Sequence, residues 1–138
     1  MSREAPAPPE QSAPADRCAF CRIKPDELID ENPLAAGLRA THPVSPGHAL
    51  IVPRRHVADF FDLTDQEKAA IWVLIDPVRQ AIGEEHRPDG YNLGLNNGTA
   101  AGQTIMHAHL HVIPRYTGDV EDPRGGVRWI LPKSARYW

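Results

Sequence analysis

The sequence predicts a single α+β domain built on an antiparallel sheet. The expected elements run as strands, one long helix and further strands, without the repeated strand–helix–strand alternation of a parallel sheet. The 138 residues, 41% of them apolar, are enough for one compact core and argue against two independent domains. Histidines also alternate with apolar residues over 107–112, which is typical of a strand with one buried face.

The first 16 residues are expected to lie outside this domain. Half of them are alanine or proline, and they offer no apolar cluster that could be buried. We therefore predict a disordered Ala/Pro-rich tail over 1–16 and a folded domain over 17–138. At the start of that domain we expect a turn around Cys18 and Cys21, followed by a short helix that opens at Pro25.

Four segments have the composition of β-strands. Residues 34–40 and 48–53 flank a loop with two prolines and a glycine, which predicts an antiparallel hairpin with a wide turn. Residues 91–95 and 103–114 form a second pair, joined by the glycine-bearing loop 96–102. The two pairs supply the predicted antiparallel sheet.

One long helix is predicted between the two strand pairs. Glu67 follows Thr64 by three residues, a spacing typical of a capping box at the start of a helix. Apolar residues then recur at helical spacing at Ile71, Leu74, Ile75, Val78 and Ile82. Because Pro77 lies inside this pattern and lacks an N–H donor, we expect a kink between Val73 and Pro77.

The charge balance and hydropathy narrow the choice of partners. Fifteen basic and 18 acidic residues give a formal net charge of −3, so no overall positive field attracts nucleic acid or an anionic membrane surface. No run approaches the roughly 20 apolar residues of a membrane-spanning helix, and the proline-rich start lacks the apolar centre of a secretory signal. We expect a cytoplasmic protein.

The alternating histidines are the most informative residues in the chain. Strand side chains point alternately to the two faces, so His107, His109 and His111 should project from one side and the apolar residues between them from the other. Neighbouring imidazoles disfavour each other's protonation, and packing alone does not favour such a row. Metal ligation and catalysis are the two interpretations that remain.

Cys18 and Cys21 form a C-x-x-C motif, which is half of a tetrahedral zinc site. A thioredoxin-like redox pair is the alternative, but that motif normally follows a strand and opens a helix, whereas this one follows the proline-rich tail. We therefore favour zinc, with His56 and one of the alternating histidines as the remaining ligands. Such a site would attach the N-terminal segment to the sheet.

Three longer strings resemble one known family. HAHLHVI resembles the signature of the histidine triad (HIT) superfamily, as do PVSPGHALIVPRRHV and LNNGTAAGQTIMHAHLHVIPR; with CAFC they span residues 18–115. The closing GGVRWILPKSARYW is similar to a bacterial, diadenosine-polyphosphate-hydrolase-like subgroup. The resemblance implies a five-stranded antiparallel sheet with two helices, a homodimer, and a nucleotide substrate attacked at its α-phosphate.

The resemblance also implies roles for individual residues. It makes His109 the nucleophile that becomes nucleotidylated. His48 and His111 are implied to flank the phosphate, and Gln103 and Thr104 to contact the phosphates or the leaving group. Asn96 matches an asparagine beside them. We also expect backbone N–H groups around Gly102 to converge on the same phosphate. Structural zinc is implied on Cys18, Cys21, His56 and His107, with no catalytic metal required.

One residue departs from that pattern, and the role of the C-terminal segment stays open. Ala40 stands where many HIT proteins have an acidic residue that accepts hydrogen bonds from the ribose, so that contact is missing. The C-terminal residues 124–138 carry four basic residues and no acidic one, together with three aromatic residues. The basic side chains could reach a polyphosphate or simply be solvated, and the aromatic ones could stack on a base or pack in a dimer.

The function that these observations predict is a histidine-dependent nucleotidyl hydrolase or transferase, with dinucleoside polyphosphates as the favoured substrates. One alternative is a nucleotide sensor with the same pocket and little turnover. A second is a nucleoside phosphoramidase, and a third is a metalloenzyme whose catalytic ion is held by His107, His109 and His111.

Overall fold

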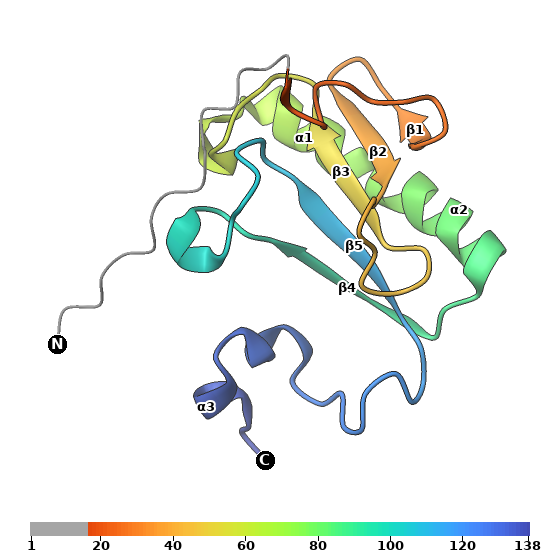
Figure 1. The fold of residues 1–138 in the computed structure, drawn as a ribbon, viewed down its shortest axis with the longest axis vertical. Coiled ribbons are helices and arrows are strands. Elements are labelled where there is room, and N and C mark those ends of the chain that lie inside the picture. The colour runs from red at the N-terminus through yellow and green to blue at the C-terminus, as the bar shows by residue number, and fades with distance from the viewer. Residues whose placement is uncertain (1–16) are drawn as a thin grey trace, which may run out of the picture.

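The computed structural model describes residues 17–138 and contains one five-stranded antiparallel sheet of strand order β1-β2-β3-β5-β4. The strands are β1 (Leu28–Glu31), β2 (Ala35–Arg39), β3 (Ala49–Pro53), β4 (Gly90–Leu95) and β5 (Leu110–Arg115). Helices α1 (Asp65–Val73) and α2 (Ile75–His86) lie across one face of the sheet (Figure 1). The predicted α+β class and the five strands implied by the resemblance are confirmed. The tail predicted for 1–16 lies outside the described residues.

The long helix begins and bends where the sequence predicted. The Thr64 hydroxyl accepts a hydrogen bond from the Glu67 N–H at 3.1 Å, and the Glu67 carboxylate accepts one from the Thr64 N–H at 2.9 Å. This reciprocal pair is the predicted capping box. The helix is interrupted at Leu74, because Pro77 has no N–H to donate to the Val73 carbonyl one turn earlier. The implied two helices are therefore the two halves of one kinked helix.

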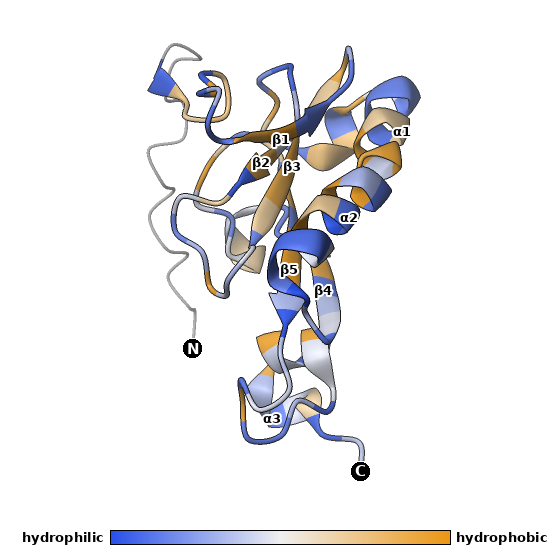
Figure 2. Ribbon diagram, turned by 90° about the vertical axis from the view of Figure 1, so that its right-hand side faces the viewer, coloured by the Kyte–Doolittle hydropathy of each residue, from blue (hydrophilic) through white to orange (hydrophobic). Residues whose placement is uncertain are grey.

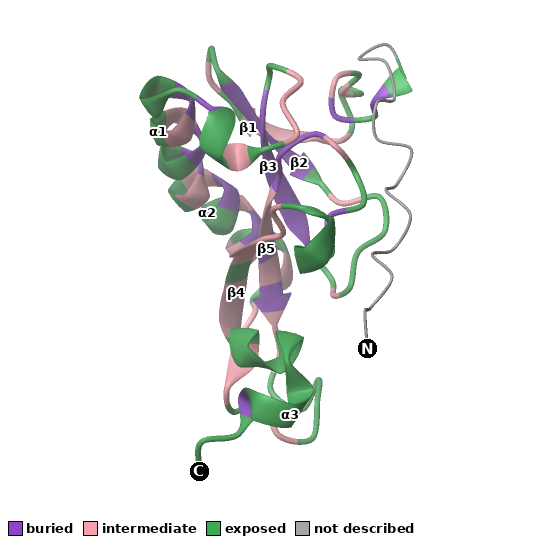
Figure 3. Cartoon of the chain, turned by 90° about the vertical axis from the view of Figure 1, so that its left-hand side faces the viewer, coloured by how far each residue is buried: buried purple, intermediate pink, exposed green. Residues whose placement is uncertain are grey.

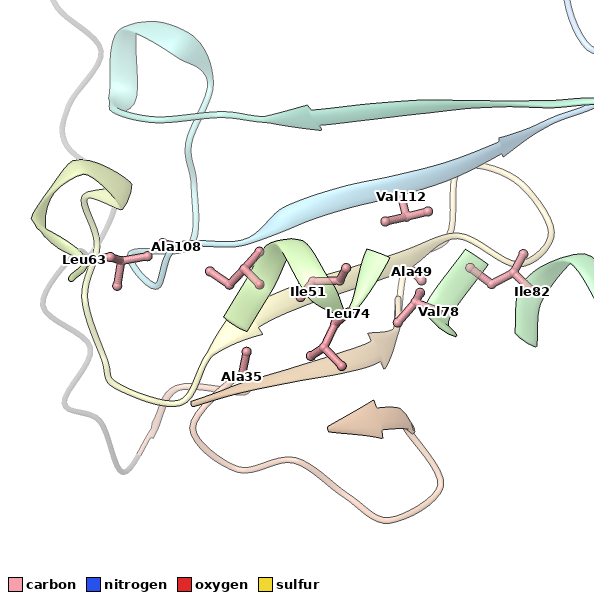
Figure 4. Close-up of a cluster of buried hydrophobic side chains, with 10 residues drawn as sticks. Ala35, Ala49, Ile51, Leu63, Leu74, Val78, Ile82, Ala108 and Val112 are labelled. Atoms are coloured by element: carbon pink, nitrogen blue, oxygen red, sulfur yellow. The ribbon is translucent and has the colours of Figure 1, made fainter. Parts of the chain in front are cut away.

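The main core lies between this kinked helix and the sheet (Figure 4). Its buried members are Ala35, Ala49, Ile51, Leu63, Ile71, Leu74, Val78, Ile82, Ala108 and Val112. Ala108 and Val112 belong to the predicted apolar face of the alternating segment, which therefore points to the helices. Figure 2 shows apolar residues concentrated on the central strands, and Figure 3 shows the same strands as buried.

A smaller cluster covers part of the opposite face of the sheet. It contains Cys18, Phe20, Ala36, Leu38, Leu50 and Val52. Residues of β2 alternate between the two clusters, as strand geometry requires. The N-terminal cysteine turn is thus attached to the face that carries the histidines.

Two of the predicted elements differ from the structure. The prediction of a helix that opens at Pro25 is wrong. Pro25 lies in a turn, and Leu28–Glu31 pairs with β2 as an edge strand. Tertiary pairing there overrides the local helix signal. The last strand, predicted over 103–114, begins only at Leu110. The chain before it bends because the Ala108 N–H donates to the Val57 carbonyl instead of to a neighbouring strand.

The C-terminal segment extends beyond the β4–β5 end of the sheet (Figures 1 and 3). It contains the short 3-10 helix η4 (Gly126–Ile130) and the four-residue helix α3 (Pro132–Ala135). Several of its large apolar side chains are exposed, including those of Ile130 and Leu131. Within residues 17–138, no helix has the length and apolar character needed to cross a membrane.

Gly37 allows the helix to approach β2, and this provides a test of the fold. A Cβ at this position would overlap Val78 on α2. We expect Gly37→Ala to lower the free energy of unfolding by about 1–3 kcal/mol, measured by urea denaturation. Gly90→Ala, on an edge strand with open space around it, should stay within about 0.5 kcal/mol of the native protein. Equal losses in the two variants would contradict this packing.

Candidate active site and metal centre

The histidine row lies on the face of the sheet opposite the kinked helix. His111 on β5 is paired with Leu50 on β3, and cross-strand partners share a face, so His111 points to the side of the smaller apolar cluster. The ring centroids of His109 and His111 are 5.1 Å apart, and those of His111 and His48 are 5.2 Å apart. The structure thus brings these three predicted site residues together.

A chain of hydrogen bonds fixes the protons of His48 and His111. The Val44 N–H donates to Nδ1 of His48 at 3.1 Å, so a neutral His48 carries its proton on Nε2. That Nε2 lies 2.9 Å from Nδ1 of His111, which must then accept the proton's hydrogen bond. A neutral His111 therefore has its own N–H on Nε2. No residue among 17–138 accepts from this N–H, so it is available to a ligand.

His109 is held in the opposite tautomer. Its Nδ1 lies 2.8 Å from the carbonyl oxygen of His107, which can only accept a hydrogen bond. The proton of a neutral His109 is thus on Nδ1, and Nε2 keeps a free lone pair. The ring is only 8% exposed and contacts Phe20, whose ring centroid is 5.1 Å away. This arrangement presents a nucleophilic nitrogen.

Burial keeps these imidazoles uncharged at neutral pH. It lowers the pKa of His109 and of His48, and the neighbouring His109 lowers the pKa of His48 further. Burial, His109 and His48 together lower the pKa of His111 to about 4. An unprotonated His109 can attack an electrophile, whereas an imidazolium cannot.

Four side chains form a cluster with the composition of a metal site. The donor atoms of Cys18, Cys21, His56 and His107 all lie within 4.8 Å of one another. Nδ1 of His107 is 3.5 Å from each sulfur and 3.3 Å from Nδ1 of His56. Zinc bonds of about 2.0 Å to nitrogen and 2.3 Å to sulfur, arranged tetrahedrally, place two nitrogens about 3.3 Å apart and a nitrogen and a sulfur about 3.5 Å apart. These donors therefore fit a zinc ion.

The surroundings of His107 also suit metal ligation. Its Nε2 lies 2.6 Å from the Pro53 carbonyl oxygen, so the proton of the neutral ring is on Nε2 and Nδ1 is free to coordinate. The side chain is fully buried. Without a cation, burial and the neighbouring Cys18 raise the pKa of Cys21 to about 11, so this thiol needs a metal ion to become a thiolate.

Of the other predicted substrate residues, one lines a cavity beside the histidines and two lie in the loop before the histidine row. Asn96 lines a cavity of about 320 Å³ together with His48 and His111. Gly102 ends the 3-10 helix η3 (Thr99–Ala101) with a φ of +94°, a left-handed conformation that favours glycine. Thr104, two residues later, is exposed. The expectation that N–H groups around Gly102 converge on the phosphate is wrong, because the Gly102 N–H donates within the loop to the Thr99 carbonyl at 3.0 Å.

Gln103 is buried, and its amide is used by the loop. Its Oε1 accepts from the Gly98 N–H at 2.8 Å, and its Nε2 donates to the carbonyls of Ala58 and Ile105 at 2.9 and 3.1 Å. These bonds hold the loop before the histidine row in place. The catalytic role predicted for Gln103 therefore stays a prediction, and the geometry gives it a positioning role.

Several residues of the site were not identified from the sequence. Val44 sets the tautomer of His48 through its backbone, which no side-chain pattern reveals. Phe20 packs between His107 and His109, and its place inside the CAFC string was an available signal. Gly126 and Val127 of the C-terminal segment line the cavity beside His111, a contact created only by the tertiary fold.

Comparison with known proteins identifies the family. The HIT domain family matches residues 22–118, most of the chain. An adenosine 5'-monophosphoramidase of Schizosaccharomyces pombe, hnt1, is 36% identical over 116 residues, which cover 81% of this chain and 82% of that protein. The chain therefore belongs to the HIT family.

Two further relatives are longer proteins. The bifunctional bis(5'-adenosyl)-triphosphatase/adenylylsulfatase FHIT of Arabidopsis thaliana is 35% identical over 100 residues, which are 72% of this chain and 56% of that protein. The AP-4-A phosphorylase of Mycobacterium tuberculosis is 43% identical over 79 residues, which are 56% of this chain and 40% of that protein. The chain thus spans about half the length of these relatives.

A solved structure supports both the fold and the metal centre. The zinc-bound histidine triad family protein of Mycobacterium smegmatis matches with a TM-score of 0.67 and 34% identity. The match covers 77% of this chain and 80% of that one. A relative with this fold therefore does bind zinc, and the chain has a Cys/His cluster able to hold a metal.

The tautomers and the lowered pKa values can be measured directly. We expect imidazole ¹⁵N NMR spectra at pH 7 to show neutral rings, with the proton on Nδ1 in His109 and on Nε2 in His48 and His111. On acidification, His111 should titrate with a midpoint near pH 4, because burial and its two imidazole neighbours oppose its charging. An imidazolium at His109 at pH 7 would contradict the geometry.

Proposed function

We propose that the protein is a nucleotidyl hydrolase or transferase that attacks the α-phosphate of nucleoside 5'-phosphate derivatives, with dinucleoside polyphosphates as favoured substrates. The hydrogen bond from His109 Nδ1 to the His107 carbonyl carries this proposal, because it leaves Nε2 of a neutral ring free to attack. The names of the relatives support it: one is a bis(5'-adenosyl)-triphosphatase and another an AP-4-A phosphorylase.

The first step forms a covalent intermediate. Nε2 of His109 attacks the α-phosphorus in line, a P–N bond forms, and the P–O bond to the leaving phosphate breaks with its electron pair on that oxygen. Negative charge on the non-bridging oxygens is met by the Nε2–H of His111, which has no acceptor among residues 17–138. The His107 carbonyl stabilises the positive charge that develops on the His109 ring.

The second step releases the nucleotide. Water, or a phosphate or alcohol acceptor in a transferase, attacks the same phosphorus from the side that the leaving group has vacated. The P–N bond breaks with its electron pair returning to Nε2 of His109, and the proton of the attacking water or alcohol passes to solvent. Two easier displacements thereby replace one difficult displacement. We assign Thr104 and Asn96 to the binding of the phosphates and the leaving group, and Gln103 to the positioning of the loop before the histidine row.

We further propose that Cys18, Cys21, His56 and His107 hold a structural zinc ion. Bound zinc would join the N-terminal turn to the strand that carries the nucleophile. The donor set uses only one of the three alternating histidines, since His109 and His111 are hydrogen-bonded elsewhere. This supports a structural metal over a catalytic ion held by the whole row.

A nucleoside phosphoramidase is the second candidate. The relative hnt1, whose match covers 81% of this chain and 82% of that protein, is named as an adenosine 5'-monophosphoramidase. The same attack by His109 would break a P–N bond of the substrate in place of a P–O bond. Comparison of kcat/KM for adenosine 5'-phosphoramidate and for dinucleoside polyphosphates separates the two candidates.

We also propose a cytoplasmic homodimer. β4 is an edge of the sheet, and Leu93 on this strand is exposed beside Trp72 and Val73 of α1. An unpaired strand edge next to apolar side chains is suited to association. The unpaired thiols of Cys18 and Cys21 are typical of a reducing compartment.

The nucleophile can be tested by substitution. We expect His109→Asn to lower kcat by about 10³-fold or more on any substrate, because no other group can form the intermediate. Mass spectrometry of the native protein, quenched during turnover, should find a nucleotidyl adduct on the peptide that contains His109. His86→Asn, at the end of α2, serves as the matched control and should keep native turnover. Substantial turnover in His109→Asn would exclude the covalent route.

The metal centre makes a separate prediction. The purified native protein should contain about one zinc ion per chain by plasma mass spectrometry, and the double variant Cys18→Ser/Cys21→Ser should contain almost none. The variant should also unfold at a lower temperature, because the N-terminal turn loses its attachment. His42→Asn, in an exposed loop, should retain the metal. Zinc bound equally well by the double variant would show that these thiols are not ligands.

A further inference from the structure

A groove leads from the histidine row to the C-terminal segment. The cavity beside His48 and His111 adjoins a second cavity of about 440 Å³, and the two share Val44, Asn92 and Ile113 as walls. The second adjoins a third of about 590 Å³, with Arg115 and Val120 in common. The three cavities therefore form one path between the sheet and the C-terminal segment.

The floor of this groove is one face of β5. His111, Ile113 and Arg115 are at alternate positions of the strand, so their side chains share a face. The distance from His111 to Arg115 along the strand is about 13 Å, at roughly 3.3 Å per residue. A short polyphosphate bridge that starts at the His111 end can cover this span.

The outer end of the groove carries an aromatic ring and a free cation. Trp129 lines the third cavity and is 36% exposed. Arg136 lies over this ring at 5.7 Å and over the Trp138 ring at 5.9 Å, and among residues 17–138 it forms no ion pair with a carboxylate. A tryptophan face stacks on any nucleobase, and a guanidinium binds phosphate oxygens.

The other charged side chains that line the outer cavity either form ion pairs within the protein or can accept hydrogen bonds from a nucleoside. Arg115 donates to Asp119 and to Asn92, so it is not free for phosphate, and the wall residue Asp122 accepts from Arg124. Glu121 adds a carboxylate to the lining. Carboxylates accept hydrogen bonds from ribose hydroxyls and exocyclic amines, which makes this end more suitable for a nucleoside than for phosphates alone.

We propose that the outer end of the groove is a subsite for the second nucleoside of a dinucleoside polyphosphate, with its base stacked on Trp129 and its phosphates contacted by Arg136. This inference rests on the proposed function and specifies its substrate. The first nucleotide is attacked at the His109 end, and the departing half extends along β5 into the outer cavity. The C-terminal segment then determines preference for substrates with two nucleosides.

The test compares two substrates in the full chain. For Trp129→Ala, the ratio of kcat/KM on diadenosine tetraphosphate to kcat/KM on adenosine 5'-phosphoramidate should fall about 10- to 100-fold, since only the dinucleotide reaches the ring. Arg136→Ala should lower the same ratio. An unchanged ratio in either variant, with phosphoramidate still cleaved, would overturn the subsite and leave the proposed function intact.

A conservative variant separates stacking from folding. Trp129 also donates a hydrogen bond from Nε1 to the Arg124 carbonyl at 2.7 Å, and Trp129→Phe loses this bond but keeps an aromatic face. We expect Trp129→Phe to recover most of the native ratio. A ratio as low as that of Trp129→Ala would show that the hydrogen bond, and not the ring face, is responsible, and would overturn the subsite.

Two matched controls complete the experiment. Tyr137→Ala removes an exposed aromatic residue of the same segment that does not line the groove, and Arg79→Ala removes an exposed arginine on α2. Both should keep the native ratio. A fall in Tyr137→Ala equal to that in Trp129→Ala would overturn the subsite. A native protein that cleaves neither substrate would instead refute the proposed function, and the subsite with it.

Discussion

The hydrogen bond from the His109 ring to the His107 carbonyl is the interaction on which the site depends. It fixes the tautomer of the nucleophile and leaves a lone pair on the opposite nitrogen. The carbonyl can do this only if its own residue is immobile. His107 is held by the Pro53 carbonyl on one side and faces the two cysteines and His56 on the other. The Cys/His cluster and the proposed nucleophile therefore share one residue and one stretch of backbone.

The fold explains why this stretch is not a regular strand. The Ala108 N–H donates to the Val57 carbonyl, so the chain lies outside the sheet at His109 and enters it at Leu110. Buried imidazoles destabilise the folded state unless their nitrogens have hydrogen-bond partners. Here the partners are backbone groups of the β3 end, of the loop before β3 and of the histidine segment itself. The orientations of the imidazole rings are thus fixed largely by backbone groups of neighbouring segments.

Local sequence was sufficient for most of the fold and for part of the site. The capping box at Thr64, the interruption caused by Pro77 and the alternation around His109 each depend on residues close together in the chain, and each was predictable. The edge strand β1 was not, because only pairing with β2 stabilises it. The role of the Val44 N–H and the engagement of the Gln103 amide depend on contacts between distant segments. The groove toward Trp129 likewise exists only after the C-terminal segment has folded beside β4 and β5.

The central claim is that a histidine nitrogen displaces the leaving group and is then displaced itself. The stereochemical course at phosphorus tests this most directly. A substrate made chiral at the α-phosphorus by sulfur should be hydrolysed in water enriched in oxygen-18, and the configuration of the product should be determined. Two successive in-line displacements give net retention of configuration, which is the result that the structure predicts. Inversion would mean that water attacks phosphorus directly and would contradict the account.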